Sequence, residues 1–492
     1  MKIYRLTITL QEPMTCGAKR MVGNQAPSLD YIPATALCGA IAAALARKGK
    51  AARIPRLFGG PSPRWCPAWP CGSNDNETVI PMPLSYLHVK GDDGFKGKFG
   101  VINTLRTQRP LTTDNYIKLF GEDAPSEIPE RLQWVKMAPG WLKFEVTKDV
   151  ILEPGLIAPD LNNAMFHGAD YLTRSARDGW LYSREYIAAY QQFLAYVVDA
   201  NDAIQEEDKA ITKIFVGKRI TAGNGYATLA WEDVGKLYPP WATYAALDHK
   251  EVTIQIMSPA IIPGRQGGFL TGLDEKSWSE ILDVDVEVKH AQSKTDPVHG
   301  WITVWDLPRE RYAAVAAGSC YLLKLRDDDT KKLTKFHFAL KGLVDKGLGI
   351  RTGEGFGWVS VSPPWLKGDH HKGNETGGNG FDPVGTVQQN DNMSQSSKRS
   401  FIEAAWKFAH TADVAPKANE LAAIAHRVTD ASSFYNYLNS LAQRKNPRKW
   451  DIVRKAWEEN GHPLIDNDDP EAINYIRYFL SWAKTFADKH ED

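Results

Sequence analysis

Two glycine-rich stretches carry the residue types best suited to hold an anion. They read GKRITAGNGYA from Gly217 and GIRTGEGFGWV from Gly349, and they share the pattern Gly-x-Arg-x-x-x-Gly-x-Gly-aromatic at an offset of 132 residues. Bare backbone N–H groups and an arginine can hold a phosphate, and an aromatic face can stack a base. Glycines with positive φ in a plain turn explain the pattern without a ligand, so the residues alone leave both interpretations open. The matching residues are Gly217, Arg219, Gly223, Gly225 and Tyr226, then Gly349, Arg351, Gly355, Gly357 and Trp358.

The second stretch lacks the context of a nucleotide-binding loop. Such a loop must lead into a helix whose N-terminus faces the phosphates. Here GEGFG leads into WVSVSPPW, which is typical of a strand stopped by proline, and no G-x-x-x-x-G-K-[ST] loop occurs in the sequence. We therefore reject a dinucleotide-binding or P-loop function.

A second pair of segments indicates that the chain contains a duplication. LTITLQEP at 6–13 and VTIQIMSP at 252–259 lie at an offset of 246, and each alternates like a half-buried strand that stops at proline. Each glycine stretch thus closes a unit that opened with a similar strand. Because the two offsets differ, the first unit must carry long insertions.

The elements around these landmarks predict the fold. IPATALCGAIAAALARKG at 32–49 predicts a helix that stops at glycine, and LYSREYIAAYQQFLAYVV at 181–198 predicts a second helix of the first unit. In the second unit, YLLKL at 321–325 and FHFAL at 336–340 alternate like strands, and the acids of 327–329 predict a solvated hairpin turn rather than a metal site. A strand, a glycine-marked loop and a helix begin a ferredoxin-like βαββαβ unit.

We therefore predict an α+β protein with two tandem ferredoxin-like (RRM-like) domains with insertions, followed by a C-terminal helical region. The predicted domains are 1–240, with large insertions, and 250–365. A polar linker at 366–398, rich in Gly, Asn, Ser, Asp and Gln, precedes helical periodicity at 399–492. The aromatic stripes of this tail pack on the tail itself or on the two domains, or form a partner interface. They include Trp406, Phe408, Tyr435, Tyr437, Tyr478 and Trp482.

Composition limits the possible classes of function. The 492 residues carry no formal net charge and are 43% hydrophobic, which indicates a packed globular protein without a global field for nucleic acid. No apolar run is long enough to span a membrane, and five cysteines fit a reducing compartment, so we predict a cytoplasmic protein. Cys66 and Cys71, with Cys38 and His88, are the nearest zinc candidates, but buried or loop thiols are favoured and we predict no metal or cofactor.

Several longer segments resemble the RAMP superfamily of CRISPR-associated RNA-binding proteins. YIPATALCGAIAAAL resembles the entry to the first helix of that superfamily, and RLFGGPSPRWCPAWP followed by VIPMPLSYLHVKG resembles the loop before its "PxPlSl…K" segment. RDGWLYSREYI and VAAGSCYLLKL are similar to its Leu-Tyr helix start and to a strand entered through Ala-Gly-Ser. Over residues 1 to 365 the motif order most resembles the large two-domain subunit of type III-D effectors, the Csx-ten family.

The resemblance implies a non-catalytic RNA-binding structural subunit of a crRNA-guided effector ribonucleoprotein in antiviral defence. Its partners would be crRNA and other CRISPR effector subunits, with target RNA reached indirectly. The glycine-loop residues, with Lys218, would touch RNA or a neighbouring subunit. A basic segment at 19–64, in which Asp30 is the only acid, points the same way, although charge around a helix end explains it equally simply. Its cations include Lys19, Arg20, Arg47, Lys48 and Arg53.

The alternative is an endoribonuclease that processes CRISPR repeat RNA or cuts target RNA. His167, beside Asp170, Arg174 and Arg177, is the best candidate for metal-free acid–base chemistry, and Asp30 is the candidate for metal-dependent cleavage. We favour the simpler interpretations. These make His167 a loop histidine bonded to nearby backbone and Asp30 a cap of the following helix.

Overall fold

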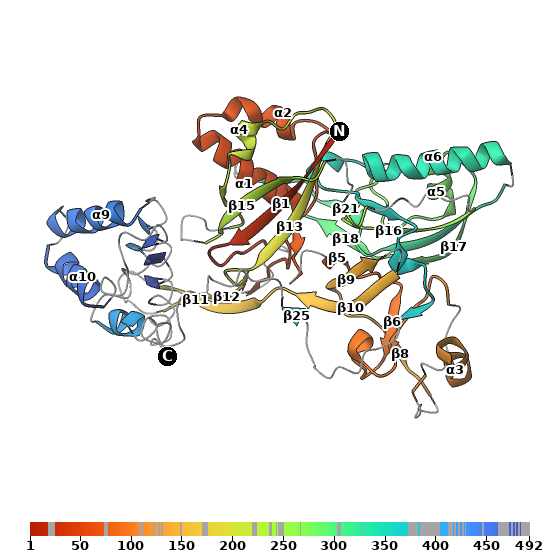
Figure 1. The fold of residues 1–492 in the computed structure, drawn as a ribbon, viewed down its shortest axis with the longest axis horizontal. Coiled ribbons are helices and arrows are strands. Elements are labelled where there is room, and N and C mark those ends of the chain that lie inside the picture. Colours follow the sequence, from red (N-terminus) through yellow and green to blue (C-terminus); the bar gives the residue numbers. More distant parts are fainter. Residues whose placement is uncertain are drawn as a thin grey trace. The chain divides into compact units, whose positions relative to one another are not determined.

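The computed structural model divides into two compact units. Unit 1 comprises 1–218 and 224–386, and unit 2 comprises 219–223 and 387–492 (Figure 1). The residues outside its description are 18–24, 73–76, 108–111, 122–123, 126–127, 129–130, 148–149, 170–175, 219–223, 236–238, 243, 245–249, 266, 303–306, 328, 372–381, 384–403, 412–416, 418–419, 422–423, 426–427, 429, 445–446, 461–471, 474–475, 478, 481–482 and 484–492. Everything else is described, apart from some side chains of strands and helices.

The first sheet of unit 1 is built around the N-terminal strand, as predicted. β1 (Lys2–Leu10) pairs antiparallel with β13 (Gln192–Asp199) on one side and with β15 (Tyr226–Asp233) on the other. Edge strand β14 (Lys213–Phe215) follows β15, while β3 (Arg64–Trp65) and β4 (Trp69–Pro70) pair with β13. The order is β14-β15-β1-β13-β3, and β4 also pairs with β13.

Helix α1 (Ala34–Arg47) confirms the predicted first helix. Its apolar side chains Leu37, Ile41 and Leu45 are buried in one cluster with Leu6 and Ile8 of β1. The second predicted helix, at 181–198, is wrong, because this segment forms β12 (Ala176–Ile187) and β13. Alternating side chains in these strands outweigh the helix-forming residues between them. The short helices of this half are α2 (Ile54–Phe58) and the one-turn α4 (Glu206–Lys209).

The second sheet has the order β17-β22-β16-β23. Its strands are β16 (Glu251–Ile256), β17 (Val286–Gln292), β22 (Cys320–Leu325) and β23 (Val359–Val361), and its helices are α5 (Glu275–Leu282) and α6 (Thr330–Lys346). The strand predicted at 321–325 is confirmed. Two short hairpins extend this half, β18 (Thr295–Val298) with β21 (Tyr312–Val315) and β19 (Trp301–Ile302) with β20 (Leu307–Pro308).

Two neighbouring predictions in this half are wrong. The segment 336–340 lies inside α6 and is not a strand, because Phe336, Leu340 and Val344 have the spacing of one buried helix face. The described acids before it, Asp327 and Asp329, connect β22 to α6 and not one strand to another, so no hairpin turn forms there, and Asp328 lies outside the described residues. Asp329 instead caps α6, accepting a hydrogen bond from the backbone N of Lys331 at 2.9 Å.

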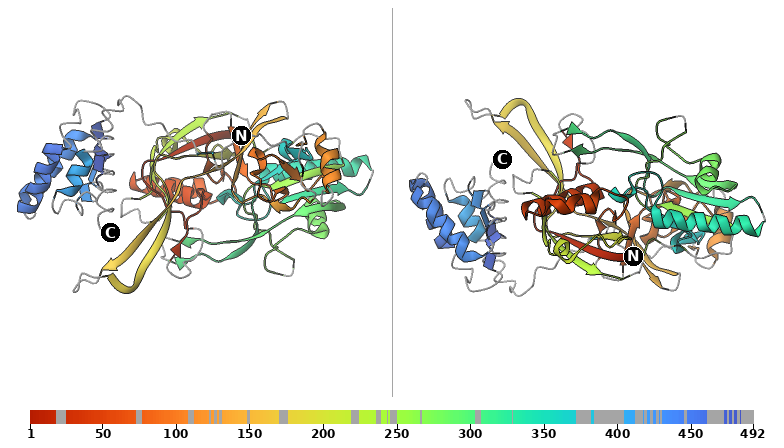
Figure 2. Two further views of the ribbon diagram at one scale, coloured as in Figure 1. Left: turned by 90° about the horizontal axis from the view of Figure 1, so that it is seen from below. Right: turned by 90° about the horizontal axis from the view of Figure 1, so that it is seen from above.

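The first half carries a long insertion, which lies between β4 and β13 in the sequence and forms further sheets. Its hairpin of β11 (Leu161–Ala169) with β12 extends away from the other sheets of unit 1 (Figure 2). The other strands of these sheets are β2 (Gln25–Ala26), β5 (Glu77–Pro81), β9 (Trp141–Thr147), β10 (Val150–Ala158), β25 (Asp382–Pro383), β6 (Tyr86–Val89), β7 (Val101–Asn103), β8 (Trp134–Lys136) and β24 (His370–His371). Helix α3 (Thr113–Phe120) lies between β7 and β8 in the chain.

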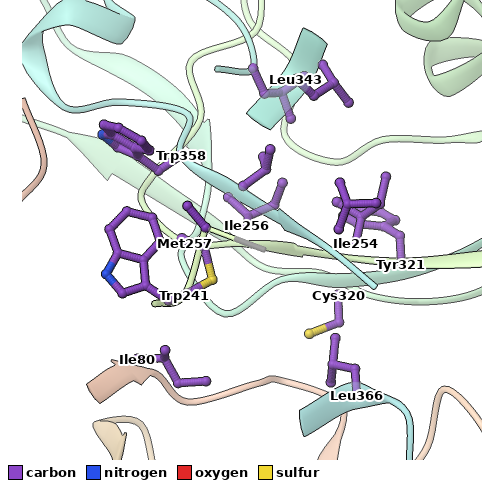
Figure 3. Close-up of a cluster of buried hydrophobic side chains, with 14 of the residues drawn as sticks. Ile80, Trp241, Ile254, Ile256, Met257, Cys320, Tyr321, Leu343, Trp358 and Leu366 are labelled. Carbon is purple, nitrogen blue, oxygen red and sulfur yellow. The ribbon is translucent and has the colours of Figure 1, made fainter. Parts of the chain in front are cut away.

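The largest core joins the insertion to the second sheet. Ile80 of β5 is buried in the same cluster as Ile254, Ile256 and Tyr321 of the second sheet (Figure 3). The predicted boundary near residues 240–250 therefore separates two sheets that belong to one compact unit. Most of the predicted linker, 372–381 and 384–398, lies outside the described residues, and its remaining parts contribute β24 and β25.

Unit 2 is helical where it is described. Its longest helices are α9 (Ala431–Arg444) and α10 (Pro447–Asn460). Its buried cluster, which includes Phe408, Phe434, Trp457 and Phe479, draws all its members from this unit. In the described part of the chain, no helix is long and apolar enough to cross a lipid bilayer.

Candidate functional site

The described ends of the first glycine stretch adopt the same backbone arrangement as the equivalent residues of the second. Each closes on itself and hydrogen-bonds to the residues that follow the first strand of its own half. Within the stretches, Val216 N donates to Gly225 O (2.8 Å), and Leu348 N donates to Gly357 O (2.8 Å). To the residues after the first strand, Gly225 N donates to Pro13 O (2.9 Å), and Gly357 N donates to Pro259 O (2.9 Å). In the third equivalent pair, Lys218 N donates to Thr15 O (3.0 Å), and Ile350 N donates to Ile261 O (2.9 Å). The offset of 132 recurs in all three pairs, and the offset of 246 recurs in the two pairs that involve the residues after the first strand, so the duplication extends to individual hydrogen bonds.

Glycine is required at several of these positions by neighbouring backbone. Gly225 has φ +79°, and a Cβ atom there would lie 1.9 Å from the carbonyl oxygen of Val216. Gly357 has φ +68°, with the carbonyl oxygen of Leu348 at 2.0 Å from such a Cβ. A Cβ atom on Gly217 would lie 2.5 Å from the carbonyl oxygen of Thr15, and one on Gly349 would lie 2.2 Å from that of Ile261. The turn interpretation therefore accounts for these four glycines.

The aromatic residues of the pattern are buried. Tyr226 is 3% exposed and Trp358 is fully buried. Their backbone N–H groups donate to equivalent side chains, that of Tyr226 to Glu12 (3.3 Å) and that of Trp358 to Ser258 (3.0 Å). Neither ring offers a face on which a base could stack, so this part of the ligand interpretation is wrong.

The second glycine stretch packs against the first half of unit 1. A Cβ atom on Gly355 would lie 2.2 Å from Cβ of Ala34 at the start of α1, and one on Gly353 would lie 2.5 Å from the carbonyl oxygen of Gly60. The indole N–H of Trp358 donates to the carbonyl oxygen of Trp65 at 3.0 Å. We call this contact between residues 353–358 and the first half the internal joint.

Arg351 is already paired inside the second stretch. Its guanidinium donates to both carboxylate oxygens of Glu354 at 2.9 and 2.7 Å, and its side chain is only 16% exposed. Burial alone would raise the pKa of Glu354, but hydrogen bonds and charges from Arg351 and Arg309 outweigh it and hold that pKa below its ordinary value. Arg351, the cation that the sequence predicts as a phosphate ligand in this stretch, thus forms an ion pair within the stretch.

Arg64 completes the internal joint, although the sequence predicted it only as one cation of the basic segment at 19–64. It is 5% exposed, lies over the Trp358 ring at 3.8 Å and donates to the carbonyl oxygens of Val344 (3.0 Å) and Asp345 (2.6 Å). These carbonyls end α6, where a cation also suits the helix dipole. The only sequence signal that could have indicated a buried role for Arg64 is its position directly before the buried strand residue Trp65.

The first glycine stretch is described only at its ends. Arg219 and Gly223 lie outside the described residues, as do Lys19 and Arg20. Lys218 is exposed, and on edge strand β14 Lys213 is exposed beside the half-buried Phe215. The exposed Arg47, at the end of α1, lies over the Phe215 ring at 4.9 Å. We call Arg47, Lys213, Phe215 and Lys218 the first-loop patch. Lys213 and Phe215 were not predicted as site residues, because the three residues KIF are too few to show a strand or a binding motif.

The rest of the basic segment is partly neutralised by acids from a distant segment. Arg53 donates to both carboxylate oxygens of Asp208, from Nε at 3.1 Å, and Lys50 pairs with Glu207 at 2.9 Å. Lys48 donates to the carbonyl oxygen of Ala210 at 2.9 Å. The prediction of a basic face at Arg53 is therefore wrong, because α4 brings acids that lie about 150 residues away in the sequence.

The two candidate catalytic residues have different settings. Asp30 accepts a hydrogen bond from the Trp141 indole at 2.9 Å, and burial raises the pKa of its carboxyl. It does not cap α1, whose N-cap is Pro33 without a side-chain bond. His167 lies in strand β11, opposite Leu181, so its prediction as a loop residue is wrong; its side chain is not described.

The residues that were the nearest zinc candidates in the sequence have other environments. Cys66 and Cys71 are buried thiols, and burial raises the pKa of Cys66. The His88 ring bonds to the carbonyl oxygen of Asp92 at 2.8 Å. No three His, Cys, Asp or Glu side chains among the described residues are grouped so that they could hold a metal ion.

Two motifs that resemble the RAMP pattern meet in space. Leu84 of PMPLSY donates its backbone N–H to the carbonyl oxygen of Gly318 of AGSCY at 2.8 Å. A Cβ atom on Gly318 would lie 2.3 Å from the carbonyl oxygen of Met82. The buried amide of Gln255 joins the same region by donating to the carbonyl oxygen of Pro81 at 2.8 Å. These motifs therefore hold the insertion against the second sheet.

Comparisons with known proteins gave matches among solved structures alone. No protein-family model and no curated protein matched the chain. A chain of the type III-B Cmr-beta complex, bound to cognate target RNA and AMPPnP, is 14% identical, with 68% of this chain and 93% of that chain covered and a TM-score of 0.36. Thermus thermophilus Cas6 is 9% identical over 73% and 97% of the chains, with a TM-score of 0.31. A RAMP protein binding different RNA substrates is 9% identical over 73% and 99%, with a TM-score of 0.27. TM-scores of this size establish neither a fold nor a function for this chain.

Proposed function

We propose that this chain is a non-catalytic RNA-binding structural subunit of a type III, III-D-like, crRNA-guided effector ribonucleoprotein in cytoplasmic antiviral defence. Its partners are crRNA and neighbouring effector subunits, and it reaches target RNA indirectly. The observation that carries the proposal is the set of equivalent hydrogen bonds that fixes a glycine stretch at the end of the first strand in each half. This arrangement supports the motif resemblance to the RAMP superfamily independently of residue identity.

The strand orders support two tandem ferredoxin-like RAMP domains. In a βαββαβ unit the first strand lies between the third and fourth, and the second strand lies at the edge beyond the third. β1 lies between β13 and β15, with β3 and β4 beyond β13, and β16 lies between β22 and β23, with β17 beyond β22. We infer that α1 and the reduced α4 are the helices of the first unit, and that α5 and α6 are those of the second.

The two glycine stretches then have different roles. The second one serves the internal joint, where Gly353 and Gly355 let the first half approach closely. We assign guide-RNA contact to the first stretch and the first-loop patch, where Arg47 lies over the Phe215 ring and Lys213 and Lys218, close to Phe215 in the sequence, are exposed. Exposed cations around an aromatic ring are what a single-stranded nucleic acid requires. The Asp30 carboxylate accepts a hydrogen bond from the Trp141 indole, which favours a structural role for this carboxylate.

RNA binding by charge-reversed variants tests this assignment. Fluorescence anisotropy with labelled CRISPR-repeat RNA should give about tenfold weaker binding for Lys213→Glu and for Lys218→Glu, and each should reduce the salt dependence by about one phosphate contact. Lys118→Glu, exposed on α3, is the matched control and should bind like the unmodified protein. Equal losses for all three variants would refute the patch, and absence of RNA binding by the unmodified protein would refute the function.

A further inference from the structure

Helix α6 exposes an apolar side chain that its own fold does not use. Phe338 is 79% exposed, more than any other large hydrophobic side chain among the described residues, although the same helix buries Phe336, Leu340, Leu343 and Val344. Figure 1 shows α6 along the margin of unit 1. Phenylalanine is one of the aromatic residues that are enriched in protein interfaces relative to the rest of the surface.

A second irregular feature lies one turn further along the same face. Gly342 is four residues after Phe338, and a Cβ atom there would meet nothing within 4 Å. Glycine inside a helix is less stable than alanine, because its backbone loses more conformational freedom. No packing within the described chain calls for it. The face therefore carries a projecting ring and, next to it, a shallow hollow.

Three lysines around Phe338 are paired with acids, which disfavours a nucleic acid there. Lys335 pairs with Asp283 at 2.6 Å, and Lys341 pairs with Asp345 at 2.6 Å. Lys332 similarly contacts Asp327. An apolar centre inside a rim of paired charges fits a protein surface better than a phosphate backbone.

We propose that α6 is a self-association face on which two copies of this chain pair with their α6 helices antiparallel. Phe338 of each copy then lies over Gly342 of the other, which is the reciprocal contact that twofold symmetry requires. The same register places Asp345 of one copy opposite Lys335 of the other, twice. Both side chains are accessible, at 33% and 52% exposure, and their present surface ion pairs are cheap to exchange.

The size of the contact sets the expected affinity. One helix pair buries less than the roughly 1,200 Å² of standard interfaces, so the dimer should be weak and reversible, with a Kd on the order of 10–100 µM. This inference goes beyond the proposed function, because it concerns the RNA-free protein. Its failure would leave the RNA-binding proposal intact.

Sedimentation equilibrium of the full-length, RNA-free chain tests it between about 1 and about 200 µM. The unmodified protein should pass from monomer to dimer. Phe338→Ala should weaken the dimer at least about tenfold, because the anchor side chain is lost. Gly342→Gln should weaken it equally while raising thermal stability, because it fills the hollow and improves the helix. Ile117→Ala, which changes a 45% exposed side chain on α3, is the control and should leave the dimer unchanged.

Charge exchange checks the antiparallel register. Lys335→Asp alone should weaken the dimer because it faces Asp345 of the second copy, and adding Asp345→Lys should restore it. A chain that stays monomeric at the highest concentration, or a dimer that survives both Phe338→Ala and Gly342→Gln, would overturn the proposal. Unchanged sedimentation with weaker RNA binding by Phe338→Ala would also overturn it and would assign the face to RNA.

Discussion

Single residues in the two glycine stretches are determined mainly by backbone contacts. Gly225 and Gly357 adopt positive φ and lie against a carbonyl oxygen of their own loop. Arg351, which the sequence predicts as a phosphate ligand, is bonded to Glu354. The pattern of residue types therefore indicated a repeated backbone arrangement correctly. Whether the stretches can also bind a phosphate depends on which of their side chains are exposed, and the pattern does not show this.

Alanine at Gly225 should destabilise the protein far more than alanine at a glycine of similar φ without close neighbours. Gly235 has φ +72° and nothing within 4 Å of a Cβ position, so Gly235→Ala should cost only about 1–2 kcal/mol of backbone strain. Gly225→Ala adds a clash with Val216 and should lower the free energy of unfolding by about 3–5 kcal/mol. Urea denaturation measures both, and equal losses would contradict the close approach.

Arg64 should contribute strongly to stability through the internal joint. Arg64→Ala removes two hydrogen bonds from a charged group and the contact with Trp358, so we expect a loss of about 2–4 kcal/mol in urea denaturation. Arg64→Lys should recover little, because an ammonium cannot reproduce the planar stack. Arg56→Ala, at an exposed arginine of α2, should change stability by less than about 0.5 kcal/mol. A similar small loss for Arg64→Ala would argue against the joint.

Among the elements, repeated and strongly patterned segments could be predicted from the sequence, and ambiguous ones could not. β1, β16 and α1 are where the alternation, the prolines and Gly49 indicate. The segment 336–340 read as a strand because exposed Phe338 imitates alternation, whereas the helix is evident only when Leu343 and Val344 are included. The acids of α4 could not be placed beside Lys50 and Arg53 without the fold, because tertiary contact brings them together.

Strand β24 should make the stability of unit 1 sensitive to acid. The Tyr86 hydroxyl donates its single proton to the carbonyl oxygen of Trp365, so its oxygen accepts a hydrogen bond from Nε2 of His371 at 2.9 Å. Burial lowers the pKa of His371 from its ordinary 6.5 to about 4, against a backbone hydrogen bond at Trp365 that raises it. The unfolded chain thus binds the proton more readily, so this contribution is complete above pH 6.5 and is lost as the pH falls toward 4.

Urea denaturation at several pH values measures this effect. Between about pH 7.5 and about pH 5 the free energy of unfolding should fall by about 1–2 kcal/mol because of His371. His371→Gln should remove that part of the pH dependence, and His88→Gln on strand β6 of the same sheet should retain it. An unchanged profile for His371→Gln would show that other groups cause the acid sensitivity.

For the whole molecule, the division into units differs from the series of domains expected from the sequence. Buried residues of the insertion and of the second sheet share one core, whereas the core of unit 2 draws only on its own helices. Sequence patterns report periodicity within elements, but not which sheets share side chains. The long core that joins 77–158 to 251–366 could therefore not be derived from them.

Removal of 387–492 should leave unit 1 folded. The truncated chain should keep its main calorimetric transition within about 4 °C, because its core loses no buried residue, and it should bind RNA as before, since the first-loop patch lies in unit 1. Calorimetry of the full and truncated chains, with RNA binding in parallel, gives the comparison. A truncated chain without a cooperative transition would show that unit 1 depends on unit 2.

The most direct test of the central claim follows bound RNA and its integrity in one sample. Labelled CRISPR-repeat RNA is incubated with the full chain, with and without divalent metal, and analysed on native and denaturing gels. We predict a shift that weakens as salt rises, with intact RNA in both conditions. Specific cleavage that is lost in His167→Ala without metal, or in Asp30→Ala with metal, would contradict the account and make the chain a nuclease.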